Sequence, residues 1–449
     1  MSQSPTTATV EHGGDGSAVA VHRPEALACI STPIPSHKIA EQPQSLSRIW
    51  YLLGLPFVLG IALFLTQSDP ALVLMREGWL IFTLFAAVYT ASWGLAAGFE
   101  RFPSVPRSDT AVFALCVGLI PSGGALLFSS VYHPPYFVTA AALLCVGWFL
   151  GSIFLFGSRT RSHLAVIPGG AARALLETSK VKNNGQVKAA VGESVNGVAA
   201  DLHQPTLNGY QGMLARNSLL GLPVYHAAYI YELLSGRVHL ASTCDISAGG
   251  RAPGPLYPWI KRGMDVTLVI LSLPVTIPLM LLTSLAIWVE SPGPVLFTQD
   301  RIGKDGRSFR MIKFRSMSLD AEKNGARFAG EKDPRVTRVG KFIRKFRIDE
   351  LPQFWNVIRG DMSLIGPRPE QVHFVQRFNE EIPHYACRHA VCPGITGWAQ
   401  VRAGYAADTK ETRHKLSYDL YYVKHRSFVL DVLIVCLTVK TMLTGFGAR

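Results

Sequence analysis

The chain has 449 residues, of which 48% are hydrophobic, and it carries a formal net charge of +13. These values predict a membrane protein of two or three domains with a large basic soluble part, which suits an anionic membrane surface or phosphate-rich substrates. Because the sequence contains no basic recognition helix with interleaved aromatic residues, we expect no nucleic-acid partner.

Residues 1–47 are rich in Ser, Pro, Thr, Gly and Ala and show no hydrophobic periodicity. Such a composition buries too little apolar surface to offset the entropy of ordering, so it predicts a disordered cytoplasmic tail. The segment has no short basic start followed by an apolar core, and it therefore does not have the pattern of a signal peptide.

Residues 48–157 contain successive apolar runs, each close to the ~20 residues that cross the ~30 Å hydrocarbon core of a bilayer. The runs cover residues 49–67, 78–98, 110–131 and 136–157. The turn between the last two contains no Lys or Arg, whereas basic residues flank the opposite ends of the bundle, with Arg76 as the exception. The positive-inside rule therefore predicts a bundle of four transmembrane helices with both ends in the cytoplasm.

Residues 158–254 predict a short soluble connector. The stretch from His163 to Arg173 has the pattern of a strand, a glycine turn and a helix start, which resembles the opening of a Rossmann-like unit. The full G-x-G-x-x-G fingerprint is absent, and residues 180–215 are polar without clear strands. We therefore interpret the connector as a shortened Rossmann-like α/β module with a structural role, in preference to a nucleotide site.

A fifth apolar run covers residues 264–289 and contains Ser272, Pro274 and Pro278. Proline removes a backbone donor and clashes with the preceding turn, so we expect this helix to bend. The run itself leaves a membrane crossing and a re-entrant hairpin equally open. The tract that follows is dense in Lys and Arg, and this charge favours a re-entrant helix over residues 261–290, which keeps the tract in the cytoplasm.

The tract from residue 291 onward has the pattern of a soluble α/β domain. Residues 295–302 and 308–314 predict a hairpin around the turn from Gly303 to Gly306. The final apolar run, residues 427–443, contains charged side chains, so we expect an interfacial or docked helix in place of a crossing one.

Asp349 and Glu350 are adjacent carboxylates that lie just after a run of cations. The cations are Arg338, Lys341, Arg344, Lys345 and Arg347. Opposite charges nearby lower the pKa of a carboxyl group, so we expect both acids to stay ionised. An ionised Asp can act as a nucleophile, a neighbouring Glu can hold a divalent metal, and the cations can hold phosphates. This combination predicts a phosphoryl-transfer centre.

A structural interpretation fits the same spacing. Asp349 can cap a helix over residues 350–359 that ends at Gly360, and Glu350 then suits the helix dipole. The buried stripe of that helix would consist of Leu351, Phe354, Trp355 and Ile358. The spacing alone leaves the catalytic and the structural interpretation equally open.

Several motifs follow one another in the last part of the chain. They are Lys313-Phe-Arg-Ser-Met317, Asp333-Pro-Arg-Val-Thr-Arg338, Asp349-Glu-Leu-Pro-Gln353, Gly366-Pro-Arg-Pro369, Pro393-Gly-Ile-Thr-Gly-Trp-Ala-Gln-Val-Arg402 and Tyr418-Asp-Leu-Tyr-Tyr422. With these motifs, residues 256–449 closely resemble the bacterial sugar transferase family, the monotopic phosphoglycosyl transferases that load a sugar phosphate onto polyprenyl phosphate. The leading apolar runs resemble those of long-form members that initiate exopolysaccharide or O-antigen synthesis, although the connector is shorter than theirs.

The resemblance implies a reaction in two steps. The Asp of the Asp-Glu pair attacks the sugar-side phosphate of a UDP-sugar and UMP leaves, after which undecaprenyl phosphate takes the sugar phosphate from the aspartyl intermediate. Carried over to this chain, Asp349 is the nucleophile and Glu350 is the Mg²⁺ ligand. The substrate-binding cations that we expect are Arg338, Arg344, Arg368 and Arg402. The break of the re-entrant helix maps onto Ser272 and Pro274.

The predicted fold is thus a membrane α-helical bundle of four transmembrane helices, a short α/β connector over residues 158–254, and a mainly helical α/β monotopic catalytic domain over residues 255–449. We expect a multi-pass protein of the bacterial inner membrane, with a cytoplasmic catalytic domain that uses UDP-glucose or UDP-galactose. N-acetylated sugars and a homodimer stay open. The alternative is a non-enzymatic scaffold or translocator for polysaccharide export. It predicts charged side chains inside the four leading runs, and the sequence has none there.

Overall fold

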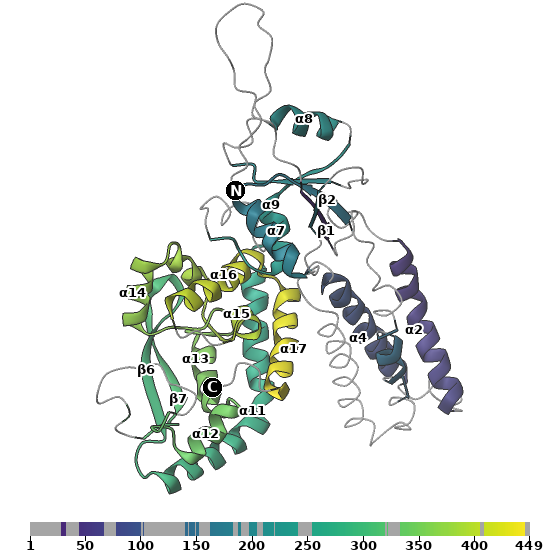
Figure 1. The fold of residues 1–449 in the computed structure, drawn as a ribbon. Coiled ribbons are helices and arrows are strands. Elements are labelled where there is room, and N and C mark those ends of the chain that lie inside the picture. The colour runs from purple at the N-terminus through teal and green to yellow at the C-terminus, as the bar shows by residue number, and fades with distance from the viewer. Residues whose placement is uncertain are drawn as a thin grey trace, which may run out of the picture.

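The computed structural model describes most of the chain from residue 254 onward and parts of the region before it. The described residues are 28–32, 45–66, 78–99, 102, 140–141, 143–148, 150–151, 162–182, 187–189, 197–203, 210–219, 221–240, 254–318, 321, 333–404 and 408–444. Figure 1 shows these residues as a pair of long N-terminal helices, a small sheet with its own helices, and a larger C-terminal body.

The connector, together with a strand from residues 28–32, forms a five-stranded sheet in the order β3-β1-β2-β4-β5. Its strands are β1 (Ala28–Thr32), β2 (Ser162–Val166), β3 (Val187–Ala189), β4 (Gly197–Ala200) and β5 (Val224–His226). β2, β4 and β5 are parallel, whereas β1 pairs antiparallel with β2 and β3. One face is covered by α7 (Gly170–Lys182) and α9 (Ala227–Ser235), and the other by α8 (Gln211–Leu219).

The predicted strand, glycine turn and helix are confirmed as β2, the turn at Gly170 (φ 43) and α7. Two expectations differ from the structure. β1 lies within residues 1–47, for which the sequence predicts disorder, and β3 and β4 lie within residues 180–215, for which it predicts no strands. These strands have three to five residues, and each is ordered by partners that are distant in sequence, so a local pattern does not reveal them.

The N-terminus of α7 is closed by a carboxylate of the chain itself. In Rossmann-like units this position binds a phosphate. Here Asp201, which directly follows β4, accepts a hydrogen bond from the backbone N–H of Ala171 at 2.9 Å. His226 Nε2 lies 3.7 Å from the other Asp201 oxygen. A carboxylate at this point stabilises the helix dipole and repels phosphate, which supports a structural role for the connector.

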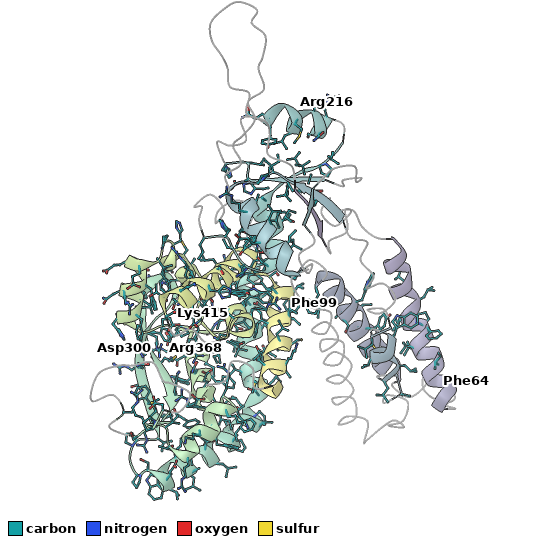
Figure 2. All side chains as sticks on the ribbon, in the orientation of Figure 1. Phe64, Phe99, Arg216, Asp300, Arg368 and Lys415 are labelled. Carbon is teal, nitrogen blue, oxygen red and sulfur yellow. The ribbon has the colours of Figure 1, made fainter. Side chains whose placement is uncertain are left out.

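Two of the four predicted transmembrane helices have a fully described backbone. α2 (Ser45–Thr66) and α4 (Gly78–Phe99) coincide with the first two apolar runs. The third run lies outside the described residues, and the described residues of the fourth are helical. At the end of α4, Phe99 lies against α17 (Phe428–Thr444) and is buried in the core of the C-terminal body (Figure 2).

α11 (Tyr257–Glu290) has 34 residues and is the single helix among the described residues that is long and apolar enough to cross a membrane. Only 17% of its most apolar window is buried, which distinguishes it from the core helix of a soluble protein. Pro274 and Pro278 lie in its middle, and Figure 1 shows the helix changing direction along its length. Ser272 Oγ donates to the carbonyl of Val269 at 2.7 Å, in the turn before Pro274.

Both ends of α11 contact the same C-terminal body. Near its start, the Asp265 carboxylate accepts a hydrogen bond from Ser363 Oγ at 2.6 Å. At its end, the Glu290 carboxylate accepts hydrogen bonds from the backbone N–H groups of Arg338 and Val339 at 2.7 and 2.9 Å. A straight crossing helix would carry its two ends to opposite faces of a bilayer.

The predicted hairpin is confirmed as β6 (Leu296–Ile302) and β7 (Ser308–Phe314). The helices after it are α12 (Arg338–Lys345), α13 (Phe354–Arg359), α14 (Val372–Glu381), α15 (Trp398–Arg402), α16 (Thr409–His425) and α17. Short 3-10 turns form η3 (Ile348–Gln353) and η4 (Tyr385–Ala390), and β8 (Ser363–Ile365) pairs parallel with β9 (Gly394–Thr396). Leu430, Leu433 and Ile434 of α17 are fully buried, so the expected docked helix is confirmed.

The connector is attached to the body through α9. Glu232 is 1% exposed, and its carboxylate contacts Lys424 Nζ at 2.8 Å and His425 Nε2 at 2.9 Å. Immediately after α9, the carbonyl of Gly236 accepts a hydrogen bond from Trp398 Nε1 at 2.8 Å. These contacts join parts of the chain that are 162 to 193 residues apart in sequence.

Candidate active site

Asp349 lies inside the 3-10 turn η3 and does not cap a helix. After α12 the chain turns through Arg347, which adopts a left-handed conformation (φ 55), and Asp349 and Glu350 then occupy the first turn of η3. The predicted N-cap is therefore wrong, because the continuous helix that it assumes begins only at Phe354. The predicted end at Gly360 is confirmed, with Gly360 in the left-handed conformation (φ 100).

The inward face of η3 and α13 combines the polar side chains of Glu350, Gln353 and Asn356 with Val357. Asn356 is buried, its Oδ1 accepts a hydrogen bond from the backbone N–H of Ile312 at 3.1 Å, and its Nδ2 donates to the carbonyl of Arg310 at 2.9 Å. These bonds hold α13 against β7. The predicted apolar stripe is wrong at Trp355 and Ile358, which are 59% and 37% exposed, because the buried positions of α13 include the side chain that bonds β7.

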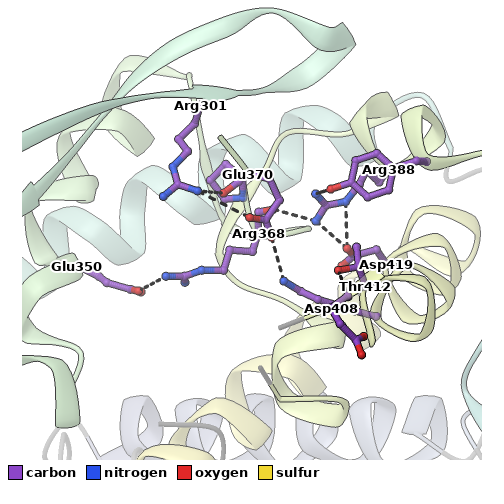
Figure 3. A network of polar contacts seen from close by, with 11 residues as sticks. Arg301, Glu350, Arg368, Glu370, Arg388, Asp408, Thr412 and Asp419 are labelled. Atoms are coloured by element: carbon purple, nitrogen blue, oxygen red, sulfur yellow. Dashed lines mark hydrogen bonds and ion pairs between the residues drawn. The ribbon is translucent and has the colours of Figure 1, made fainter. Parts of the chain in front are cut away.

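Glu350 is buried and is held by arginines. Its Oε1 accepts a hydrogen bond from Arg368 Nη2 at 2.8 Å and lies 3.5 Å from Arg347 Nη1 (Figure 3). Burial opposes the ionisation of Glu350, but the charges of Arg368, Lys313 and Arg347 outweigh it and lower the pKa of Glu350 to about 2. The Glu350 carboxylate is therefore a permanent negative charge in the site.

Asp349 behaves differently from its neighbour. Burial, followed by the negative charge of Glu350, raises the pKa of Asp349 to about 6, against the opposing charges of Lys313, Arg368 and Arg344. The sequence predicts that the cations lower the pKa of both acids, and for Asp349 the direction of this shift is wrong. The physical reason is that desolvation and a like charge next to it exceed the attraction of the cations. Asp349 remains largely ionised above pH 6.

Lys313 of β7 is a member of the site to which the sequence analysis assigned no role. Its charge acts on both Asp349 and Glu350, and burial followed by the charge of Arg368 lowers the pKa of Lys313 to about 8. In the sequence, Lys313 is marked only as the first residue of the motif Lys313-Phe-Arg-Ser-Met317. Its strand is brought to the carboxylates by the Asn356 bonds, which no local pattern contains.

The structure brings two of the four predicted substrate-binding arginines to the carboxylates. Arg368 bonds Glu350 directly, and the charge of Arg344 acts on Asp349. Arg338 is exposed at the start of α12, where its backbone N–H bonds Glu290. Arg402 lies over the ring of Trp398, with its guanidinium carbon 5.2 Å from the ring centroid. The contacts described for these last two are with residues other than Asp349 and Glu350.

Glu350 also has the free atom that a metal ligand needs. Its Oε2 is buried and has no hydrogen-bond partner. Among the described residues there is no group of three or more His, Cys, Asp or Glu side chains that could hold a metal. Mg²⁺ commonly binds through one or two carboxylates and completes its shell with water and substrate phosphates. The residues present therefore fit Mg²⁺ held through Oε2 of Glu350.

Comparison with known proteins places the chain among enzymes that act on undecaprenyl phosphate. A family model described as bacterial sugar transferase matches residues 256–445. A UDP-N-acetylgalactosamine-undecaprenyl-phosphate N-acetylgalactosaminephosphotransferase of Aeromonas hydrophila is 43% identical over 428 residues, which cover 89% of this chain and 98% of that protein. The chain belongs to the bacterial sugar transferase family. It is an enzyme, a polyprenyl-phosphate sugar phosphotransferase, and the alternative of a non-enzymatic scaffold or translocator is set aside.

Other relatives match a shorter stretch of the chain. The UDP-glucose:undecaprenyl-phosphate glucose-1-phosphate transferase of Escherichia coli (strain K12) is 42% identical over 183 residues, 40% of this chain and 39% of that protein. The exopolysaccharide production protein PSS of Rhizobium leguminosarum bv. phaseoli is 39% identical over 191 residues, 41% of this chain and 96% of that protein. The range of the family model includes Lys313, Asp349, Glu350 and Arg368.

Proposed function

We propose that this sugar transferase moves a sugar 1-phosphate from a UDP-sugar to undecaprenyl phosphate through a covalent phosphosugar on Asp349, with release of UMP. The observation that carries the proposal is the contrast between two adjacent carboxylates. Glu350 is fixed by Arg368 at 2.8 Å, whereas the pKa of Asp349 lies at about 6, among Lys313, Arg368 and Arg344. A desolvated carboxylate surrounded by cations can approach a phosphate and attack it.

In the first step, a carboxylate oxygen of Asp349 attacks the sugar-side phosphorus of the UDP-sugar. The new bond joins Asp349 to phosphorus, and the bond between that phosphorus and the bridging oxygen breaks, so that UMP leaves with the bond's electron pair. Both phosphates repel the attacking carboxylate, and the cationic side chains of Arg344, Arg368 and Lys313 offset this repulsion. Mg²⁺, when held by Glu350, supplies further charge neutralisation at the diphosphate.

In the second step, a phosphate oxygen of undecaprenyl phosphate attacks the same phosphorus. The bond from phosphorus to Asp349 breaks, the carboxylate is regenerated, and the lipid carries a diphosphate linked to the sugar. Neither step needs an oxidant, a reductant or a water molecule. The cationic side chains serve both steps, because each step brings one more phosphate to the same place.

We further propose that α11 is a re-entrant membrane anchor in a multi-pass protein of the bacterial inner membrane, with the catalytic body on the cytoplasmic face. The proposal is supported by apolar side chains that α11 exposes, such as Leu271 (69%) and Val275 (73%), and by Phe342, 59% exposed on α12. Both ends of α11 contact the C-terminal body, as is required of a bent helix that enters and leaves the membrane through the same leaflet. This placement brings the carboxylates to the depth of the lipid phosphate.

For the donor we propose UDP-N-acetylgalactosamine. The support is the relative from Aeromonas hydrophila, which matches along nearly its whole length and is named for N-acetylgalactosamine, whereas the glucose-1-phosphate transferase of Escherichia coli matches over 39% of its length. UDP-glucose and UDP-galactose, the donors expected from the sequence, are the competing candidates.

The test uses purified protein in nanodiscs with Mg²⁺, undecaprenyl phosphate and each of the three labelled UDP-sugars. We expect UMP release and a labelled lipid with UDP-N-acetylgalactosamine. Without the lipid acceptor, intact-mass analysis should detect a phosphosugar on Asp349. Asp349→Asn should abolish both signals, whereas Asp300→Asn, a matched change on the exposed face of β6, should leave them unchanged. Turnover by Asp349→Asn at a near wild-type rate would contradict the mechanism.

A further inference from the structure

A buried ion pair lies behind Arg368 and takes no part in the reaction described above. Arg388 of η4 and Asp419 of α16 are 3% and 2% exposed. Arg388 Nε and Nη2 donate to Asp419 Oδ2 at 3.1 and 2.7 Å, and Nη1 donates to the hydroxyl of Tyr385 at 3.1 Å. Nη2 also donates to the backbone carbonyl of Arg368 at 2.8 Å (Figure 3). The pair therefore contacts the backbone of the residue that holds Glu350.

We propose that Arg388, fixed by Asp419, is a positioning residue that sets the backbone of Arg368 so that its guanidinium meets Glu350. The inference rests on the proposed function of this site. A buried ion pair is weak evidence for a contribution to stability, because the desolvation of two charges offsets most of their attraction. The geometry of the Arg388–Asp419 pair is therefore more informative than its energy, and in this geometry Arg388 bonds the backbone of Arg368.

The segment around Arg368 is held through its carbonyl groups. Pro367 and Pro369 have no N–H to donate, so the backbone on both sides of Arg368 can be held only by donors that reach its oxygens. The backbone N–H of Gly394 donates to the Pro367 carbonyl at 2.9 Å, and Arg301 Nη1 donates to the Pro369 carbonyl at 3.2 Å. With the bond from Arg388 between them, three consecutive carbonyls have donors, which fixes the direction of the Arg368 side chain.

The backbone before Arg368 has no room to move. A Cβ atom on Gly366 would lie 2.4 Å from the carbonyl oxygen of Cys392, and a Cβ atom on Gly394 would lie 2.0 Å from the nitrogen of Gly366. These glycines let β8 and β9 approach each other closely. The close approach fixes the backbone at Gly366, and the bond from Arg388 fixes it at Arg368, whose side chain reaches Glu350.

Arg388 influences the reaction through position and not through its own charge. The charges that act most strongly on Asp349 are those of Glu350, Lys313, Arg368 and Arg344. The bonds described for Arg388 go to Asp419, to Tyr385 and to the backbone carbonyl of Arg368, and not to the carboxylates of Asp349 or Glu350.

The first experiment replaces the pair by apolar side chains of similar size, in Arg388→Met/Asp419→Leu. Such replacements often leave stability unchanged or improved. We expect kcat for UMP release to fall on the order of 100-fold, the scale associated with a 1 Å misplacement, while the unfolding midpoint stays near that of wild type. Arg377→Met, which removes an exposed arginine that pairs with Glu381, is the matched control and should keep the wild-type rate. A wild-type rate in the folded double variant would overturn the proposal.

The second experiment uses Arg388→Lys, which keeps the charge but not the planar set of donors. In an Arg368→Met background it should cause no further loss, because its effect runs through Arg368; losses that multiply would overturn the proposal. Arg388→Lys alone should lower kcat for UMP release while the unfolding midpoint stays near that of wild type. A lower rate that comes with a lower unfolding midpoint would mean a merely structural role.

Wild-type protein with Mg²⁺, undecaprenyl phosphate and the three UDP-sugars is assayed in parallel. If wild type releases no UMP with any donor, the proposed function fails and this inference fails with it. If wild type is active and the Arg388 variants keep its kcat, only the positioning role fails.

Discussion

Two isosteric substitutions at neighbouring positions are expected to change stability in opposite directions. Burial and the charge of Glu350 raise the pKa of Asp349 from its ordinary value of 3.8 to about 6. One pKa unit corresponds to about 1.4 kcal/mol, so the ionisation of Asp349 destabilises the folded protein by at most about 3 kcal/mol. This cost is absent below pH 3.8, grows as the pH rises toward 6, and is complete above pH 6. Asp349→Asn removes it and should stabilise the protein at pH 8.

The ionisation of Glu350 has the opposite effect on the stability of the folded protein. Despite burial, the charges of Arg368, Lys313 and Arg347 lower the pKa of Glu350 from 4.5 to about 2. The ionised carboxylate therefore stabilises the folded protein above pH 4.5, and this contribution is lost as the pH falls toward 2. Glu350→Gln should destabilise the protein at pH 8 by on the order of 3 kcal/mol, because it also leaves Arg368 without its buried partner.

The assay is the unfolding midpoint of the purified protein in detergent, followed by tryptophan fluorescence at two pH values. At pH 8 we expect the order Asp349→Asn, wild type, Glu350→Gln, from most to least stable. At pH 5 the gain of Asp349→Asn should shrink, since less of the wild-type Asp349 is ionised. A lower midpoint for Asp349→Asn than for wild type at pH 8 would refute the reasoning that burial and Glu350 outweigh the cations.

The remaining predictions concern activity and membrane binding. The kcat for UMP release should fall tenfold per pH unit below about pH 6, because only ionised Asp349 attacks, and initial rates across the pH range check the slope. In Glu350→Gln this limb should move to lower pH, since the charge that raises the pKa of Asp349 is gone, and a limb that moves up would contradict the assignment. Lys313→Met should lower kcat on the order of 100-fold with its fold intact by circular dichroism. Trp355→Glu, at a side chain 59% exposed, should weaken retention on anionic liposomes in flotation assays, while the matched polar-surface change Gln376→Glu should not.

The parts of the fold that could be predicted from the sequence are those determined by local chemistry. The β6–β7 hairpin needs a turn with positive φ, and Gly306 (φ 75) provides it. α13 ends where Gly360 adopts the left-handed conformation. The bend of α11 follows from Pro274 and Pro278, and the docking of α17 follows from charged side chains in an apolar run.

The orientation of the acids could not be predicted in this way. The turn at Arg347 is left-handed in a residue with a side chain, so no glycine marks it in the sequence. The buried stripe expected for α13 fails at Trp355, which is 59% exposed, because Asn356 and Val357 take the inward positions of this helix. Asn356, a polar residue, takes an inward position because its bonds to β7 satisfy it there.

The sequence reveals the site residues that are close to one another along the chain, and it does not reveal those that only the fold brings together. Asp349, Glu350 and Arg344 occur within seven positions of one another, so spacing revealed them. Arg368 was proposed from its rigid proline setting, and its bond to Glu350 spans 18 positions. Lys313 and Arg388 lie on strands and helices that only tertiary packing brings to the other site residues. The motif that begins at Lys313 does not indicate what that side chain contacts, and none of the motifs singled out in the sequence contains Arg388.

The carboxylate of Asp201 at the start of α7 limits what this helix end can bind. Because Asp201 accepts a hydrogen bond from the Ala171 N–H, a dinucleotide phosphate at that position would have to displace a side chain of like charge. At the other end of the same layer, Glu232 of α9 ties the connector to Lys424 and His425 of the C-terminal body. The polar contacts of the described residues therefore serve the attachment of the sheet and place a carboxylate at the helix end that would otherwise receive an anion.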